Sequence, residues 1–365
     1  MPSRAWRRLL ALTVSLLLLA GVAALATGDE DEPTRITAAP APTSTRPSTT
    51  TTAVEETTTT VAPATTAPPV TARRAPRTTS APRPVTTKAA PAPAPTPSAT
   101  GVVAAFYYGW YPSSFGFPGT KFHPSAGHYS SMDLGTVKRQ IDQMRYGGIQ
   151  AGIASWWGPG HSTDQAFPVD LAAAEGTPFK WALYYEPEGP GHPNQSPDQL
   201  RASLQYIVDR YVHHPNYLRV DGKPVIFVWP DPNDRCEMVS RWNQANAFGF
   251  HVVQKRFPGY ASCGDQPQSW HDYSPDRYSI EVKPWSYSVG PGFWRYDEGS
   301  PRLARNPGAF EAAVRSMAAS PAMWKLVTTF NEWGEGTAIE PAQEWDSPSG
   351  YGVYLDIMHA VLGSR

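Results

Sequence analysis

The sequence predicts an α/β fold in which residues 101–365 form a (β/α)8 TIM barrel. Three observations favour this fold. The segment has about the length of one such barrel, which is roughly 250 residues. Short apolar, β-branched runs alternate with helix-like stretches, as they do around a parallel sheet. Polar and aromatic residues follow the C-terminal ends of several of these runs, and in a barrel those ends meet on one face.

The strands are predicted from apolar runs bounded by turn residues. Seven are expected, at residues 102–108, 151–157, 179–185, 225–229, 250–255, 278–282 and 326–330. An eighth is expected near residues 270–273. Helices are expected at residues 134–145, 196–211 and 307–319. The second of these begins with Ser196-Pro197-Asp198, an N-cap residue followed by a proline at the first helical position.

Residues 1–28 are interpreted as a secretory signal peptide. Three arginines precede an apolar run over residues 9–26, which ends in the small residues Ala24-Leu25-Ala26. This order of basic, apolar and small residues is typical of an export signal with a cleavage site. If it stays uncleaved, the apolar run is long enough to anchor the chain in a membrane. In either case the rest of the protein is expected to be secreted or held at the cell surface.

Residues 29–100 are predicted to be a disordered linker. They consist mainly of Thr, Pro, Ala and Ser, and Trp6 is the only aromatic residue before Gly101. A stretch without aromatic residues cannot bury a core of its own. Its prolines favour extended conformations, so we expect a fairly stiff spacer between the leader and the barrel.

The predicted barrel is mildly acidic and rich in aromatic residues. Residues 101–365 contain 21 Lys and Arg, 26 Asp and Glu, 12 Trp, 17 Tyr and 13 Phe. The acidic balance argues against nucleic acid as a partner, because phosphate binding needs a basic surface. The aromatic content suits both a large core and a cleft in which rings stack on sugars, and composition alone does not separate the two.

The chain has two cysteines, Cys236 and Cys263. In an exported domain such a pair is expected to form a disulfide, here closing a loop of about 27 residues. A zinc site would need more ligands, and no group of His and Cys lies near this pair. We therefore expect neither a metal nor a cofactor, and a monomeric protein.

Two carboxylates directly follow the last predicted strand, in Asn331-Glu332-Trp333-Gly334-Glu335-Gly336. On one helical turn, residues three apart have Cβ atoms roughly 5–6 Å from each other. Retaining glycosidases hold their two carboxyl groups roughly 5–5.5 Å apart. Two like charges this close raise the pKa of one group toward that of a general acid. The alternative is a solvated acidic turn, which the position at a strand end disfavours.

Further candidate residues lie at the C-terminal ends of the predicted strands, the last one included. They are Tyr107, Tyr108, Trp156, Trp157, Tyr185, Glu186, Trp229, Lys283, Asn331 and Trp333. Each also has an ordinary structural interpretation. Glu186 before a proline suits a turn, neighbouring tryptophans on a strand point to opposite faces, and Lys283 could neutralise a nearby acid. The clustering of all ten at strand ends, rather than any single residue, predicts a mouth that binds a glycan.

Six segments resemble glycoside hydrolase family 99, the endo-α-mannosidase and endo-α-1,2-mannanase family. They are residues 106–111, 155–158, 185–187, 222–225, 289–292 and 330–340, and the last is the most specific. The resemblance implies a (β/α)8 barrel and metal-free, retaining hydrolysis of internal α-mannosidic bonds in a polysaccharide or glycan.

The resemblance also implies roles for individual residues. Glu332 would deprotonate the sugar 2-hydroxyl, whose oxygen attacks the anomeric carbon to give a 1,2-anhydro sugar. Glu335 would protonate the leaving oxygen and later activate water. Asn331, Tyr107, Trp156 and Glu186 would line the sugar subsite.

Three positions depart from the pattern of the family. Gly334 and Tyr184 stand where members usually have histidine, and Trp229-Pro230-Asp231-Pro232 stands where they usually have Tyr-Asp-Ser-Tyr. Both carboxylates remain, so hydrolysis is still expected. The departures leave open which sugar and which linkage are recognised.

Two other functions are compatible with parts of the sequence. An exported aromatic cleft could belong to a non-catalytic glycan-binding module of the cell wall. A glycosyltransferase-like relative is a further alternative. Export argues against it, because nucleotide-sugar donors are cytoplasmic. The run Gly290-Pro291-Gly292 also lacks a following helix signal, as a phosphate-binding loop would require.

Overall fold

The computed structural model describes residues 101–116 and 119–363. The predicted signal or anchor segment and the predicted linker lie outside the described residues, so those two boundaries stay predictions. No helix in the described ranges combines the length and the apolar character that crossing a membrane requires.

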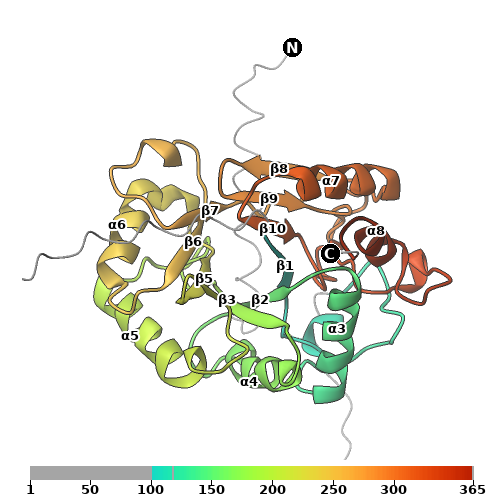
Figure 1. Cartoon of the computed structure of the whole chain (residues 1–365), viewed down its shortest axis with the longest axis horizontal. Helices are drawn as coiled ribbons and strands as arrows, with labels where there is room; N and C mark the ends of the chain where they lie inside the picture. The colour runs from blue at the N-terminus through green and yellow to red at the C-terminus, as the bar shows by residue number, and fades with distance from the viewer. Residues whose placement is uncertain (1–100, 117–118, 364–365) are drawn as a thin grey trace, which may run out of the picture. The chain divides into compact units, whose positions relative to one another are not determined.

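The described residues form a nearly closed barrel of parallel strands (Figure 1). Eight strands of the described chain make its wall: β1 (Val102–Tyr107), β2 (Ala151–Trp156), β3 (Lys180–Tyr185), β5 (Lys223–Val228), β6 (His251–Lys255), β7 (Ser269–His271), β9 (Ser286–Val289) and β10 (Trp324–Val327). Parallel ladders join them in the order β7-β6-β5-β3-β2-β1-β10-β9.

Side-chain hydrogen bonds span the remaining gap between β7 and its neighbours β9 and β10. Ser288 Oγ donates to the carbonyl oxygen of Asp272 at 2.5 Å, and Thr328 Oγ1 donates to that of Tyr273 at 2.8 Å. The prediction of an α/β barrel is therefore confirmed, with a seam where side chains replace a backbone ladder.

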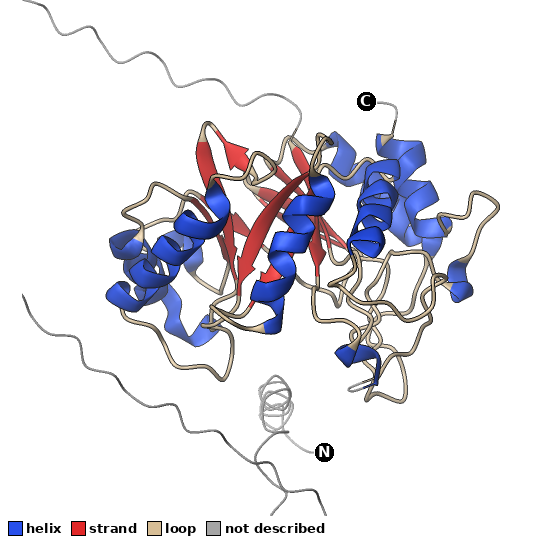
Figure 2. Cartoon of the chain, turned by 90° about the horizontal axis from the view of Figure 1, so that it is seen from below, coloured by secondary structure: helices blue, strands red, loops and turns tan. Residues whose placement is uncertain are grey.

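Helices pack around the outside of the strands (Figures 1 and 2). The longer ones are α3 (Leu134–Tyr146), α4 (Ser162–Ala174), α5 (Pro197–Ile207), α6 (Arg235–Ala245), α7 (Pro307–Ala319) and α8 (Val353–Leu362). The three helices predicted from the sequence correspond to α3, α5 and α7. Their N-caps follow the expected chemistry, because Asp133, Ser196 and Asn306 each accept a backbone N–H from the first turn.

One strand that was predicted to belong to the parallel barrel is antiparallel to it. The predicted strand at residues 278–282 is β8 (Ser279–Val282), which pairs antiparallel with β9, and β9 itself was not predicted. Its sequence, Ser-Tyr-Ser-Val, lacks the continuous apolar run that usually indicates a buried parallel strand. Because β8 runs in the opposite direction, Lys283 lies at the opposite end of the barrel from the other strand ends. Its side chain is 81% exposed, with Nζ 3.5 Å from Glu281.

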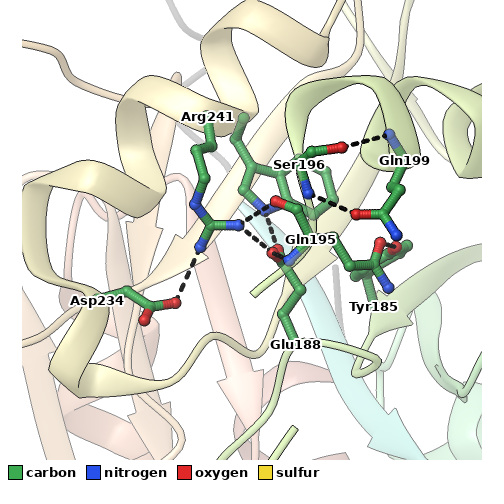
Figure 3. A network of polar contacts seen from close by, with 8 residues as sticks. Tyr185, Glu188, Gln195, Ser196, Gln199, Asp234 and Arg241 are labelled. Carbon is green, nitrogen blue, oxygen red and sulfur yellow. Dashed lines mark hydrogen bonds and ion pairs between the residues drawn. The ribbon is translucent and has the colours of Figure 1, made fainter. Parts of the chain in front are cut away.

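The predicted disulfide between Cys236 and Cys263 is present, with the two Cα atoms 5.3 Å apart. It joins the start of α6 to the loop that follows β6. A buried polar network holds the loop after β3 against α6 nearby (Figure 3). Glu188 pairs with Arg241 and accepts a hydrogen bond from Trp242 Nε1 at 2.8 Å, and Arg241 also pairs with Asp234 at 2.9 Å. These contacts fix two of the loops that form the mouth of the barrel.

Gly152 in β2 allows close packing between the strands and the helices. A Cβ atom at this position would lie 2.0 Å from the ring of the fully buried Trp181. We expect Gly152→Ala to lower the free energy of unfolding by about 1–3 kcal/mol, because overpacking a dense core displaces its neighbours. Urea denaturation followed by circular dichroism measures this change.

The matched control is Gly299→Ala, since a Cβ at Gly299 would meet no atom within 4 Å. If both variants unfold at the same urea concentration, the packing described for Gly152 is wrong.

Candidate active site

The loop after β10 carries the two predicted catalytic carboxylates, and backbone hydrogen bonds join its two ends. Phe330 N–H donates to the carbonyl of Phe106 in β1 at 2.8 Å, which continues the barrel wall beyond the end of β10. The chain then returns, because Thr329 N–H donates to Thr337 O at 3.1 Å and Glu340 N–H donates to Phe330 O at 2.8 Å. We call residues 331–337 the carboxylate loop.

Arg305 supports the carboxylate loop from behind. Its Nη2 donates to the carbonyl oxygens of Gly336 and Ala338, at 2.9 and 2.5 Å. Its guanidinium lies 3.8 Å from the ring centroid of Trp345 and 4.9 Å from that of Tyr354. A buried, stacked arginine has little freedom to move, so it fixes the backbone of the loop.

The segment between β9 and α7 supports the loop from the side. Trp294 N–H donates to Glu335 O and Tyr296 N–H donates to Gly334 O, both at 2.9 Å. Gly336, at φ +63°, fits closely here, since a Cβ on it would lie 2.5 Å from the carbonyl oxygen of Trp294. Only glycine therefore suits this position.

Glu332 is buried with one oxygen unpartnered. Its side chain is 7% exposed, and its Oε1 accepts the backbone N–H of Glu335 at 3.2 Å. Its Oε2 has no hydrogen-bond partner among the described residues. Burial, and then the charge of Glu335, raise the pKa of Glu332 well above its usual range.

Glu335 is better supported as an anion. Its Oε2 accepts a hydrogen bond from the Tyr273 hydroxyl at 2.9 Å, which in turn accepts one from the Tyr108 hydroxyl at 2.9 Å. Burial raises the pKa of Glu335, and the Tyr273 bond and the charges of Arg295 and Arg302 oppose that rise. Glu335 therefore has a hydrogen bond and nearby positive charges that stabilise its ionised form.

Glu186 adds a third carboxylate to the same mouth. It follows β3, is 5% exposed, and its Oε2 accepts a hydrogen bond from Ser155 Oγ at 2.9 Å. Burial raises the pKa of Glu186 to about 8; the Ser155 bond opposes the rise, and the charge of Glu335 adds to it. Three acids that disfavour one another's ionisation can hold and exchange protons near neutral pH.

Aromatic rings extend the mouth away from the carboxylates. The ring of Tyr273 lies 5.2 Å from that of Trp229, and the ring of Tyr184 lies 5.8 Å from that of Trp229. Lys255, at the end of β6, places Nζ 4.6 Å from the centroid of the Trp229 ring. These four side chains come from the ends of β3, β5, β6 and β7.

The structure brings Tyr108, Glu186, Trp229, Glu332 and Glu335 together, as the sequence predicted. Three other predicted side chains point outward, toward the helices. Tyr107 donates to Gln140 at 2.8 Å, Trp156 to Asp164 at 2.7 Å and Tyr185 to Gln195 at 2.6 Å. The reason is that neighbouring residues of a strand face opposite sides. Tyr107, Trp156 and Tyr185 therefore belong to the layer between strands and helices, which corrects the expectation that they line the mouth.

The remaining predicted residues have mixed positions. Asn331 clamps the end of β1, with Oδ1 accepting the N–H of Tyr108 at 2.8 Å and Nδ2 donating to its carbonyl at 3.0 Å. Trp333 is fully buried beneath the loop and stacks on Trp345. Trp157 is half-buried, 5.2 Å from the His192 ring. Asn331 and Trp333 thus support the site without facing it.

Lys255 and Tyr273 were missed, Ser155 was read only as part of a motif, and Tyr184 only as a departure from the family. Side chains alternate between the two faces of a strand, so Ser155 and Tyr184 face the side opposite to Trp156 and Tyr185. Ser155 and Tyr184 are also partners in the register between β2 and β3. Lys255 and Tyr273 are the last residues of the predicted strands at residues 250–255 and 270–273, so their place at strand ends was a signal that could have identified both. Among the residues that the structure describes, no group of three or more His, Cys, Asp or Glu is arranged to hold a metal ion.

Comparison with known proteins supports the family resemblance. The sequence model of glycosyl hydrolase family 99 matches residues 116–248. The resemblance to this family is confirmed. The match covers the chain from α2 (Ser113–Gly116) through α6 and ends before the carboxylate loop.

Two relatives of the chain are mammalian enzymes. Glycoprotein endo-alpha-1,2-mannosidase of Rattus norvegicus is 23% identical over 273 residues, which are 61% of this chain and 57% of the relative. The same enzyme of Mus musculus is 24% identical over 274 residues, with the same two shares. The chain thus spans less than two thirds of the length of these relatives.

Solved structures show a similar fold. The GH99 endo-alpha-mannosidase of Bacteroides thetaiotaomicron aligns with a TM-score of 0.57 and 21% identity. The alignment covers 74% of this chain and 98% of that one. A second structure, of the same enzyme in complex with bis-tris-propane, aligns with the same TM-score and 22% identity.

Glu186 is expected to make stability depend on pH. Its folded-state pKa of about 8 exceeds its ordinary value of 4.5, so folding keeps a proton that the unfolded chain releases. The stability from this group is fully present below about pH 4.5 and is lost as the pH rises toward 8. At pH 8.5 we expect Glu186→Gln to unfold at a higher urea concentration than the wild type. Its free energy of unfolding should be higher by up to about 4 kcal/mol. At pH 4.5 we expect no such gain.

The control is Glu237→Gln, which changes an exposed carboxylate of α6. A stability difference of Glu186→Gln that is the same at both pH values would show that Glu186 is not the group with the raised pKa.

Proposed function

We propose that this protein is an exported, retaining, endo-acting glycoside hydrolase that cleaves α-linked, mannan-like polysaccharides or glycans through Glu332 and Glu335. The observation that carries the proposal is a pair of carboxylates on one rigid loop at the barrel mouth, with Glu332 buried and Glu335 half-buried. One of them has an oxygen without a partner, and the other is hydrogen-bonded to Tyr273. The resemblance to family 99 supports the same reaction class.

Glu332 would act as the base of the first step. A substrate 2-hydroxyl that donates a hydrogen bond to the unpartnered Oε2 stabilises the ionised form of Glu332. Glu335 is then the member of the pair that carries a proton. Glu332 then removes the proton of the 2-hydroxyl, and that oxygen attacks the anomeric carbon. The glycosidic bond breaks as Glu335 protonates the leaving oxygen, which leaves a 1,2-anhydro sugar.

The second step reverses these proton transfers. Glu335 takes a proton from water as the water oxygen attacks the anomeric carbon. The bond between that carbon and the sugar O2 breaks, and O2 recovers its proton from Glu332. Two displacements at the same carbon give net retention of configuration. The fixed donors around the loop are in place before the reaction, as electrostatic stabilisation requires.

Two features support export. The N-terminal sequence has the order of an export signal, and the barrel contains a disulfide between Cys236 and Cys263. Disulfides form and persist mainly in oxidising compartments.

Glycan binding without turnover is the second candidate. It is favoured by the departures at Tyr184 and Trp229, which change the wall of the mouth relative to the family pattern. It predicts that no reducing ends are released from any α-mannan, and that binding survives replacement of both Glu332 and Glu335.

We expect Glu335→Gln and Glu332→Gln each to lower hydrolysis by at least about 100-fold, because each removes a group that transfers a proton in the transition state. Release of reducing ends from α-mannan and arabinomannan measures this loss, and proton NMR of the first product gives its anomeric configuration. Glu237→Gln should keep wild-type activity. Full activity in Glu335→Gln would exclude it as the acid, and an inverted first product would exclude the retaining reaction.

Tyr273→Phe is expected to shift the pH profile of the reaction. Its hydroxyl lowers the pKa of Glu335, so removing it raises that pKa. The basic limb of the kcat/KM profile reports the acid of the free enzyme and should move to higher pH. Tyr260→Phe is the control, since Tyr260 packs against Trp270 away from the carboxylates. A basic limb that stays in place or moves to lower pH contradicts the assignment of Glu335 as the acid.

A further inference from the structure

Lys255 is a cation at the mouth of the barrel without an anionic partner. Its Nζ lies over the ring of Trp229, 4.6 Å from the centroid. No carboxylate of the described residues lies within ion-pair distance of it. Burial lowers the pKa of Lys255, and the charge of Asp272 opposes this. A partly desolvated ammonium group gains most from an added anion.

The charges around Lys255 are already paired with one another. Asp272 accepts a hydrogen bond from Arg256 Nε at 2.5 Å and another from Ser274 Oγ. Asp276 lies 3.5 Å from Arg277. Each of these two acids is paired with an arginine, so neither forms an ion pair with Lys255.

Tyr184 supplies a second group that lacks a partner. Its side chain is 1% exposed, and its hydroxyl has no hydrogen-bond partner among the described residues. Its ring contacts that of Trp229, so the hydroxyl and Lys255 belong to the same wall. A buried hydroxyl without a partner is costly, and a ligand that supplies an acceptor would remove this cost.

Tyr273 connects this wall to the carboxylates. Its ring lies 5.2 Å from Trp229 and 6.4 Å from Tyr184, and its hydroxyl donates to Glu335. Two aromatic rings, Trp229 and Tyr273, therefore connect Lys255 to the group that would protonate the leaving oxygen. That is the place of a sugar next to the one that reacts, and not of the reacting sugar itself.

We propose that Lys255, Tyr184 and Trp229 form a subsite for an anionic substituent, a carboxylate or a phosphate ester, on a sugar beside the scissile bond. This rests on the proposed function for the bond that is cut, and adds the chemical class of the glycan. Tyr184 and Trp229 are two of the positions at which the sequence departs from the family pattern. Trp229 contacts both Tyr184 and Lys255, which gives these departures a shared role in specificity.

Binding to the non-cleaving Glu335→Gln variant of the full chain tests the proposal by isothermal titration calorimetry. Three probes are used: linear α-1,2-linked mannotetraose, the tetraose with a 6-phosphate on each of its two internal residues, and the tetraose oxidised at C6 of those residues to the uronic acids. We expect each charged probe to bind at least about tenfold more tightly than the neutral one in low salt. The preference should fall as sodium chloride is added. A preference for only one of the two charged probes shows whether the subsite takes a phosphate ester or a carboxylate.

Two further substitutions are made in the Glu335→Gln background. Lys255→Met should bring the ratio of neutral to charged Kd close to one, and Lys255→Arg should keep most of it. Lys283→Met, at the opposite end of the barrel, should leave the ratio unchanged. The salt titration needs no change at Lys255, so it tests the proposal even if Lys255→Met does not fold.

Equal binding of neutral and charged probes, binding of none of them, or a preference that survives in Lys255→Met overturns the subsite. Release of reducing ends from the neutral and the charged probes by the wild-type chain is measured in parallel. Turnover together with a Kd ratio of one rejects the subsite alone. A tenfold ratio without turnover of any probe rejects the hydrolase and keeps the subsite.

Discussion

The rest of the site depends on one constraint, which is that Glu186, Glu332 and Glu335 are withdrawn from water at the same end of the barrel. Burial raises the pKa of all three carboxyl groups, and the charge of Glu335 adds to the rise at Glu186 and Glu332. Such a group of acids is unfavourable by itself, and the large barrel core must compensate for it. In return, the site can exchange protons at a pH at which ordinary glutamates are fully ionised.

The same constraint explains why the carboxylate loop is held so firmly. Acids that repel one another separate if their backbone is free to move. Here, Arg305 fixes the carbonyls of Gly336 and Ala338, and the segment after β9 fixes those of Gly334 and Glu335. A site built on rigid supports keeps its geometry without reorganising during the reaction.

The likeness to family 99 and the departures from it concern different parts of the mouth. The two carboxylates stand on the loop after β10, where the resemblance was most specific. The departures at Tyr184 and Trp229 stand on the ends of β3 and β5, and Trp229 contacts Lys255. In the proposed function, reaction chemistry and glycan recognition come from separate strand ends of one barrel, the arrangement by which this fold supports many substrates.

The sequence by itself determined the barrel, most of its strands, its capped helices, the disulfide and the two acids of the carboxylate loop. Apolar periodicity, capping residues and a short motif are local signals, so they can be read along the chain. Only the tertiary structure decided which strand residues face the mouth, because a shift of one residue turns a side chain to the other side. It therefore moved Tyr107, Trp156 and Tyr185 outward. Strand direction, which placed Lys283 at the far end, depends on pairing between distant segments and has no local signal.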